Sequence, residues 1–128
     1  MITHAGTISI YVSDQSRAVE WYVETLGFEK RTDASMSKES PDVRWLEVAP
    51  PGAQTVIALQ NAAFFGNESR VGGFADVTFE CDDVQATAEA LAGRGVEITK
   101  EPTTEPWGTY FQFQDVDGNE FVVTQRRS

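Results

Sequence analysis

Two stretches of the chain follow the same pattern, and this repeat limits what the chain can fold into. Residues 7–12 alternate between polar and apolar side chains, as a β-strand does when only one of its faces is buried. Asp14 follows in the position of a helix N-cap, and an apolar stripe at helical spacing comes next. Residues 74–81 repeat the strand, Asp82 or Asp83 repeats the cap, and a second apolar stripe follows. The pattern predicts two copies of one β-α-β-β-β unit.

The remainder of each copy contains three further strand-like segments. After a first helix that ends near Gly27, a strand and its exit loop are expected at 28–36, and further strands at 43–49 and 55–60. After a second helix that ends near Gly93 or Gly95, strands are expected at 96–100, 109–114 and 120–125. The predicted fold class is therefore α+β, with two βαβββ modules whose mixed sheets form a cup around a cavity. We expect one domain over residues 1–128, with module one at about 5–60, a linker at about 61–72 and module two at about 73–126.

The charge balance narrows the class of partner. The chain has 20 acidic and 10 Lys+Arg residues, which gives a formal net charge of −10. Such a surface repels phosphate backbones and anionic lipids, so we expect neither nucleic acid nor membrane as a partner. One cysteine excludes an intrachain disulfide, and the N-terminus lacks the pattern of a secretory signal. We therefore expect a cytoplasmic protein.

The period of two assigns each strand residue to a face of its sheet. The apolar set should pack under the helices; it comprises Ile8, Ile10, Val12, Val77, Phe79 and Cys81. The opposite set should face the cavity; it comprises Thr7, Ser9, Tyr11, Asp76, Thr78 and Glu80, together with Trp45, Glu47, Ala58, Gln60, Val122 and Thr124 from later strands. The register of 109–114 stays open, because Phe111 and Phe113 sit one position out of phase with the corresponding strand of the first copy.

Several motifs resemble a known superfamily. The strand at 7–12, Asp14, and the helix residues Trp21-Tyr22 and Leu26-Gly27-Phe28 are similar to the start of a vicinal oxygen chelate module. Asp115-Val116-Asp117-Gly118-Asn119 resembles the late D-P-D-G-N turn of that superfamily, with Val116 in place of proline. The resemblance covers nearly the whole chain. It implies kinship with glyoxalase I, extradiol dioxygenases and bleomycin-resistance proteins.

The resemblance also implies where a metal would be held. Metal enzymes of this superfamily take ligands from the first and fourth strands of each module, which correspond to Thr7, Asp76, Ala58 and Val122 here. Alanine and valine have no donor atom, and a threonine hydroxyl is a poor ligand for a transition metal. His4 would need a register slip to reach the site. We therefore expect no cofactor, and a divalent metal is disfavoured.

These residues support one function and leave others open. We favour a metal-independent small-molecule-binding protein that sequesters a flat or cationic compound through stacking, cation–π contact and charged hydrogen bonds. The predicted ligand-binding residues are Thr7, Ser9, Trp45, Glu47, Ala58, Gln60, Asp76, Thr78, Trp107 and Val122. The alternative is a lyase, isomerase or dioxygenase relative with a rearranged metal site, or with Asp76 as the catalytic base. A third possibility is a scaffold with a filled cavity. We expect a homodimer.

Overall fold

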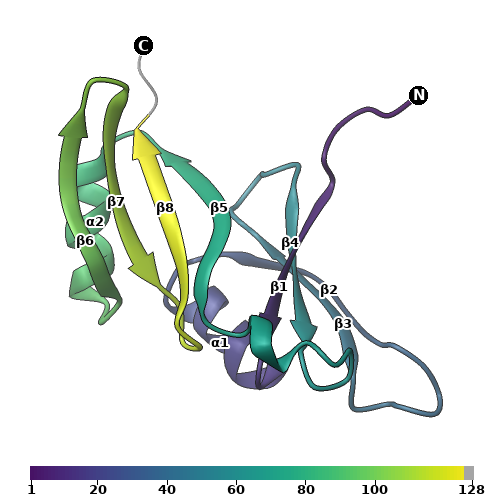
Figure 1. Cartoon of the computed structure of the whole chain (residues 1–128). Helices are drawn as coiled ribbons and strands as arrows, with labels where there is room; N and C mark the ends of the chain where they lie inside the picture. Colours follow the sequence, from purple (N-terminus) through teal and green to yellow (C-terminus); the bar gives the residue numbers. More distant parts are fainter. Residues whose placement is uncertain (126–128) are drawn as a thin grey trace. The chain divides into compact units, whose positions relative to one another are not determined.

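The computed structural model describes residues 1–125, which fall into two compact units (Figure 1). The first unit is Met1–Val71, and the second begins at Gly72. Each described unit has the predicted βαβββ order and a four-stranded mixed sheet, which confirms the α+β class. The predicted end of module two at residue 126 lies outside the described residues. The shared cavity stays a prediction.

The first unit contains five main elements and a short 3-10 helix. They are β1 (Thr7–Val12), α1 (Gln15–Glu24), β2 (Glu29–Ser35), β3 (Arg44–Ala49), β4 (Val56–Asn61) and η1 (Glu68–Arg70). The strand order is β1-β4-β3-β2, and only the β1–β4 pair is parallel. The helical connection from β1 lets two strands of one sheet run in the same direction.

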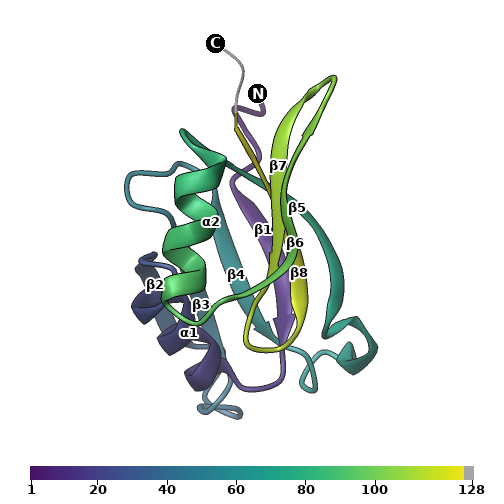
Figure 2. The ribbon, with the colours of Figure 1, turned by 90° about the vertical axis from the view of Figure 1, so that its left-hand side faces the viewer.

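The second unit repeats this arrangement. Its elements are β5 (Gly73–Cys81), α2 (Val84–Gly93), β6 (Glu97–Glu105), β7 (Gly108–Gln114) and β8 (Asn119–Gln125). The strand order is β5-β8-β7-β6, with a parallel β5–β8 pair. Figure 2 shows α2 on one side of this sheet, and α1 contacts β2, β3 and β4 of the first sheet. Each unit therefore has one sheet face that no α-helix covers, here called its helix-free face.

Both helices begin at an aspartate, as predicted. The Asp14 carboxylate accepts a hydrogen bond from the backbone N–H of Arg17 at 3.0 Å, and Asp83 accepts one from Ala86 at 3.0 Å. These bonds satisfy amide groups that have no partner within the helix. The second cap is therefore Asp83 rather than Asp82, and the two caps place the copies 69 residues apart.

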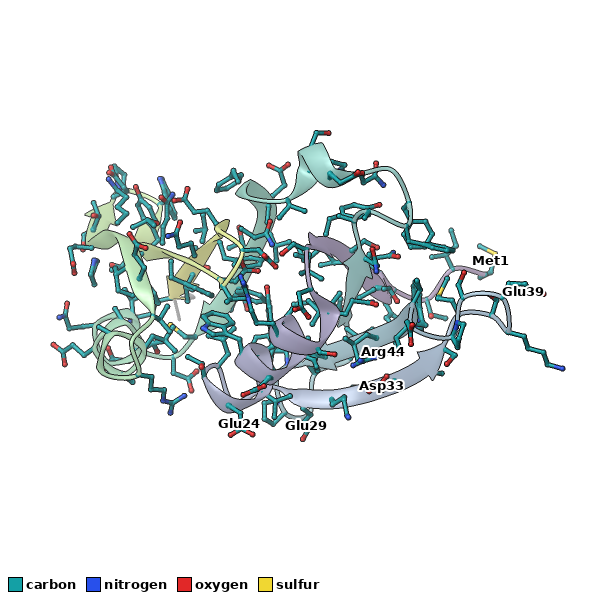
Figure 3. The ribbon with its side chains drawn as sticks, turned by 90° about the horizontal axis from the view of Figure 1, so that it is seen from below. Met1, Glu24, Glu29, Asp33, Glu39 and Arg44 are labelled. Atoms are coloured by element: carbon teal, nitrogen blue, oxygen red, sulfur yellow. The ribbon has the colours of Figure 1, made fainter. Side chains whose placement is uncertain are left out.

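Apolar side chains fill the space between each helix and its sheet. In the first unit the buried apolar residues include Ile10, Val12, Ala18, Tyr22, Leu46, Val48, Ile57 and Leu59. One polar residue, Gln15, is buried with them at 6% exposure. At the rim of the sheet, Arg44 and Asp33 lie on neighbouring strands and form a 2.9 Å ion pair (Figure 3). In the second unit the rings of Phe79, Phe113 and Phe121 pack within 6.3 Å of one another.

The structure fixes the register that the sequence left open. Phe111 pairs with Val123 and Phe113 with Phe121, and both phenylalanines are at most 2% exposed. Phe113 occupies the place that Val48 has opposite Ile57 in the first unit. Phe113 therefore has the same phase in its sheet as Val48. The sequence left this open because the connection to the next strand differs by one residue: Val48 lies nine positions before its partner Ile57, whereas Phe113 lies eight positions before Phe121.

Candidate functional site

The helix-free face of the first unit carries a connected set of polar and aromatic side chains. The Thr32 hydroxyl donates to the Glu47 carboxylate at 2.6 Å, and the Gln60 amide donates to the Ser9 hydroxyl at 2.9 Å. Trp45 is two residues before Glu47 on β3 and lies on the same face, because Leu46 between them is buried under α1. The face therefore combines an indole ring, a carboxylate and amide and hydroxyl groups.

Ala58 and Val122 occupy equivalent places in the two sheets. Ala58 pairs with Ser9 and Glu47, and Val122 pairs with Thr78 and Gln112. Neither side chain has a donor atom, and Ala58 is only 1% exposed. Within residues 1–125, no group of three or more His, Cys, Asp or Glu side chains is placed to hold a metal ion. The residues at these positions do not fit a divalent metal.

Asp76 does not occupy the place in its sheet that Thr7 has in the first sheet. Thr7 pairs directly with Val56, but β5 has an irregularity between Phe74 and Thr78, and Asp76 lies inside it. Phe74, not Asp76, is therefore the ladder equivalent of Thr7. Asp76 has a φ of 59°, the left-handed region that L-residues adopt at a cost. Its carboxylate is exposed and accepts no hydrogen bond from any group within residues 1–125.

This backbone conformation leads to a prediction for Asp76→Gly. Glycine has no Cβ, so the substitution removes the cost of the left-handed backbone. We expect the free energy of unfolding to rise by about 0.5–1 kcal/mol, as measured by urea denaturation. The matched control is Thr78→Gly in the regular part of β5, which should lower it by about 1 kcal/mol. A destabilised Asp76→Gly variant would show that the aspartate side chain itself stabilises the bulge.

The second unit has an aromatic stack on its β6–β7 hairpin. Trp107 is one of the two turn residues, is 60% exposed, and stacks on Tyr110 with ring centroids 5.1 Å apart. The Lys100 ammonium lies 5.8 Å from the centre of the Tyr110 ring. Tyr110 alternates with the buried Phe111, so it lies on the helix-free face. The tight turn thus brings an indole ring to that face.

The structure separates the predicted ligand-binding residues into two groups. Those on the first unit's helix-free face are Thr7, Ser9, Trp45, Glu47, Ala58 and Gln60; those in the second unit are Asp76, Thr78, Trp107 and Val122. Their role in ligand binding stays a prediction. The sequence reasoning did not single out Thr32, Arg70, Lys100, Tyr110 or Gln112. The pairing of Thr32 with Glu47 depends on a bulge in β2 that no sequence pattern marked.

Comparison with known proteins identifies the family. Residues 2–123 match the Glyoxalase/Bleomycin resistance protein/Dioxygenase superfamily. The chain belongs to this superfamily. It is 38% identical over 125 residues to the uncharacterized protein YetH of Bacillus subtilis (strain 168), covering 98% of this chain and 100% of YetH.

Two solved structures share both sequence and fold with the chain. A superfamily member from Sphaerobacter thermophilus DSM 20745 has a TM-score of 0.89 and 36% identity, with 98% of each chain covered. TnmS3, an antibiotic binding protein from Streptomyces sp. CB03234, has a TM-score of 0.81 and 35% identity, again with 98% of each chain covered. The glyoxalase/bleomycin-resistance fold predicted from the sequence is therefore confirmed. No helix within residues 1–125 is long and apolar enough to cross a membrane.

Proposed function

We propose that this glyoxalase-superfamily chain is a metal-independent binding protein that sequesters a flat or cationic small molecule. The observation on which the proposal depends is that Ala58 and Val122 have no side-chain atom that could bind a metal. The two fourth-strand ligand positions hold side chains without donor atoms, while aromatic and polar groups lie on the same faces. Sequestration needs affinity but no Lewis acid. The likeness to TnmS3, an antibiotic binding protein, supports a small-molecule ligand.

The side chains on the first unit's face suggest how such a ligand is held. A planar ring would stack on the half-buried indole of Trp45, and a cationic substituent would be attracted to the Glu47 carboxylate. Thr32 orients that carboxylate, since its hydroxyl donates to one of the two oxygens and leaves the other available. The second unit, taken by itself, has its own aromatic surface, formed by Trp107 stacked on Tyr110.

The proposal is tested with a panel of planar and cationic antibiotics, bleomycin included. A ligand that binds only the folded chain raises its melting temperature, by an amount equivalent to about 2.7 kcal/mol at 100 times Kd. We expect Trp45→Leu to weaken binding of a stabilising compound about tenfold, because a cation–π or stacking contact contributes about 1–2 kcal/mol. The control is Trp21→Leu on α1, which should leave the affinity unchanged.

Two results would contradict the proposal. The first is the absence of stabilisation by any member of the panel together with turnover of another compound. The second is near-stoichiometric Zn, Ni, Mn or Fe in protein purified without chelators, which would favour the enzyme alternative.

The homodimer and the cytoplasmic location stay predictions. Sedimentation at several protein concentrations measures the number of subunits in the assembly.

A further inference from the structure

Arg70 is held over an aromatic ring of the helix-free face. Its guanidinium carbon lies 4.5 Å from the centre of the Tyr11 ring. Arg70 ends the 3-10 helix η1, while Tyr11 lies on β1, so a cation–π contact connects the segment after β4 with the sheet. A guanidinium stacked on a ring keeps its N–H donors at the edge of its plane, where they can still form hydrogen bonds.

Within the described part of the chain, no acceptor is bonded to the N–H groups of the Arg70 guanidinium. By contrast, Arg31 forms an ion pair with Glu29, and Arg44 forms one with Asp33. Within residues 1–125, the Arg70 guanidinium has no carboxylate partner and donates no hydrogen bond, even though Glu68 is two residues away in η1. In a chain with twice as many acidic as basic residues, an arginine held in place without an anion is unusual.

We propose, on the basis of the binding function above, that the ligand is a planar compound with an anionic group, a carboxylate or its equivalent, and that Arg70 binds this group. The guanidinium offers two parallel donors to such an anion, and Tyr11 acts as a positioning residue that fixes the plane of the donors. Gln60 pairs with Tyr11 on the neighbouring strand and donates its amide to Ser9, so the sheet surface beside the arginine is polar.

The position of Arg70 assigns an orientation to the ligand. Tyr11 lies on β1 and Glu47 on β3, with β4 between them, so the two strands are about 10 Å apart. The anionic group then lies over β1, and the ring or cationic end lies toward Trp45 and Glu47. Long-range repulsion by the acidic surface is screened beyond about 8 Å at physiological salt, so direct contact with Arg70 decides the binding of the anionic end.

The test uses three planar probes that differ in charge: 2-naphthoate, the uncharged 2-naphthamide and the cationic 2-naphthylmethylammonium. Affinities are measured by tryptophan fluorescence and calorimetry on the full chain. We expect 2-naphthoate to bind about tenfold more tightly than 2-naphthamide, a ratio typical of a charge-assisted hydrogen bond. Arg70→Gln should abolish this ratio while leaving the affinity for 2-naphthamide unchanged, and Arg70→Lys should restore only part of it. Lys38→Gln, which removes the same charge from the exposed β2–β3 connection, should leave the ratio intact.

Variants of Tyr11 separate positioning from a structural role. Tyr11→Phe keeps the ring and should keep the preference for 2-naphthoate, whereas Tyr11→Leu should reduce it at unchanged melting temperature. If 2-naphthamide and 2-naphthoate bind wild-type protein equally, or if Arg70→Gln keeps the preference, the inference is wrong and the binding function stands. If none of the three probes binds a protein that the antibiotic panel stabilises, the inference is also wrong. If neither the probes nor the panel bind, both proposals fail.

Discussion

Asp115→Ala is expected to lower the free energy of unfolding by about 3 kcal/mol, because it removes the acceptor of several buried hydrogen bonds. One carboxylate oxygen accepts the backbone N–H groups of Asp117 at 2.8 Å and Asn119 at 2.9 Å. The other accepts the Asn119 side-chain amide at 3.0 Å. Asn119 in turn accepts the N–H of Gly72, so the turn between β7 and β8 also holds the start of β5. Loss of Asp115 leaves donors unsatisfied at a site that is only 6% exposed.

The measurement for Asp115 is thermal and urea denaturation of three variants. A loss of about 3 kcal/mol corresponds to a melting temperature about 10 °C lower for a chain of this size. Asp115→Asn keeps one acceptor but places an N–H₂ group where an acceptor is needed, so an intermediate loss is expected. Asp82→Ala, which removes an exposed carboxylate before α2, should change stability by less than about 0.5 kcal/mol. Equal stability of Asp115→Ala and wild type would show that water replaces the carboxylate.

Gln15→Ala should have an effect of similar size in the first unit. The Gln15 amide donates to the carbonyl groups of Arg44 at 2.7 Å and Leu59 at 2.8 Å, and it accepts the Arg44 N–H at 3.1 Å. Gln15 thereby joins the first turn of α1 to β3 and β4, beyond the Glu47–Ala58 pair where the regular pairing of these strands ends. Three backbone groups lose their partner in the variant, so we expect a loss of about 3 kcal/mol.

The control for Gln15 is the exposed glutamine of the other helix. Gln85 donates to Glu89 on the surface of α2, and Gln85→Ala should cost no more than about 0.5 kcal/mol. Circular dichroism during urea denaturation measures both variants. A further variant, Gln15→Glu, keeps acceptor oxygens but loses both donors, and it should be no more stable than Gln15→Ala. If Gln15→Ala unfolds at the wild-type urea concentration, the three hydrogen bonds contribute nothing net to stability.

The strands and helices were predictable because the same periodic pattern of polar and apolar residues occurs twice in the sequence. The period of two in 7–12 and 74–81, the caps at Asp14 and Asp83 and the apolar helix stripes specify a strand followed by a helix in each copy. The orientation of Trp45 and Glu47 followed from the burial expected of Leu46 and Val48, which the structure confirms at 1% and 0% exposure.

Interactions that depend on irregular backbone could not be predicted in this way. The displacement of Asp76 comes from the irregularity between Phe74 and Thr78. The alternation of polar and apolar residues does not show where a strand contains extra residues. Gln15 was missed although it lies three residues before Ala18 on the buried side of α1, since its polar side chain argues against burial. The Arg70–Tyr11 contact joins an irregular segment to β1, and no local pattern indicates it.

The unequal connections of the two copies have a practical consequence. Residues 36–43 join β2 to β3, yet the second sheet closes the same hairpin with Pro106-Trp107 alone. The longer connection therefore contains residues that the sheet does not require for closure, and loop length changes stability only weakly. It is the place in the chain where a fluorescent reporter or an affinity tag can be inserted while both sheets keep their pairing.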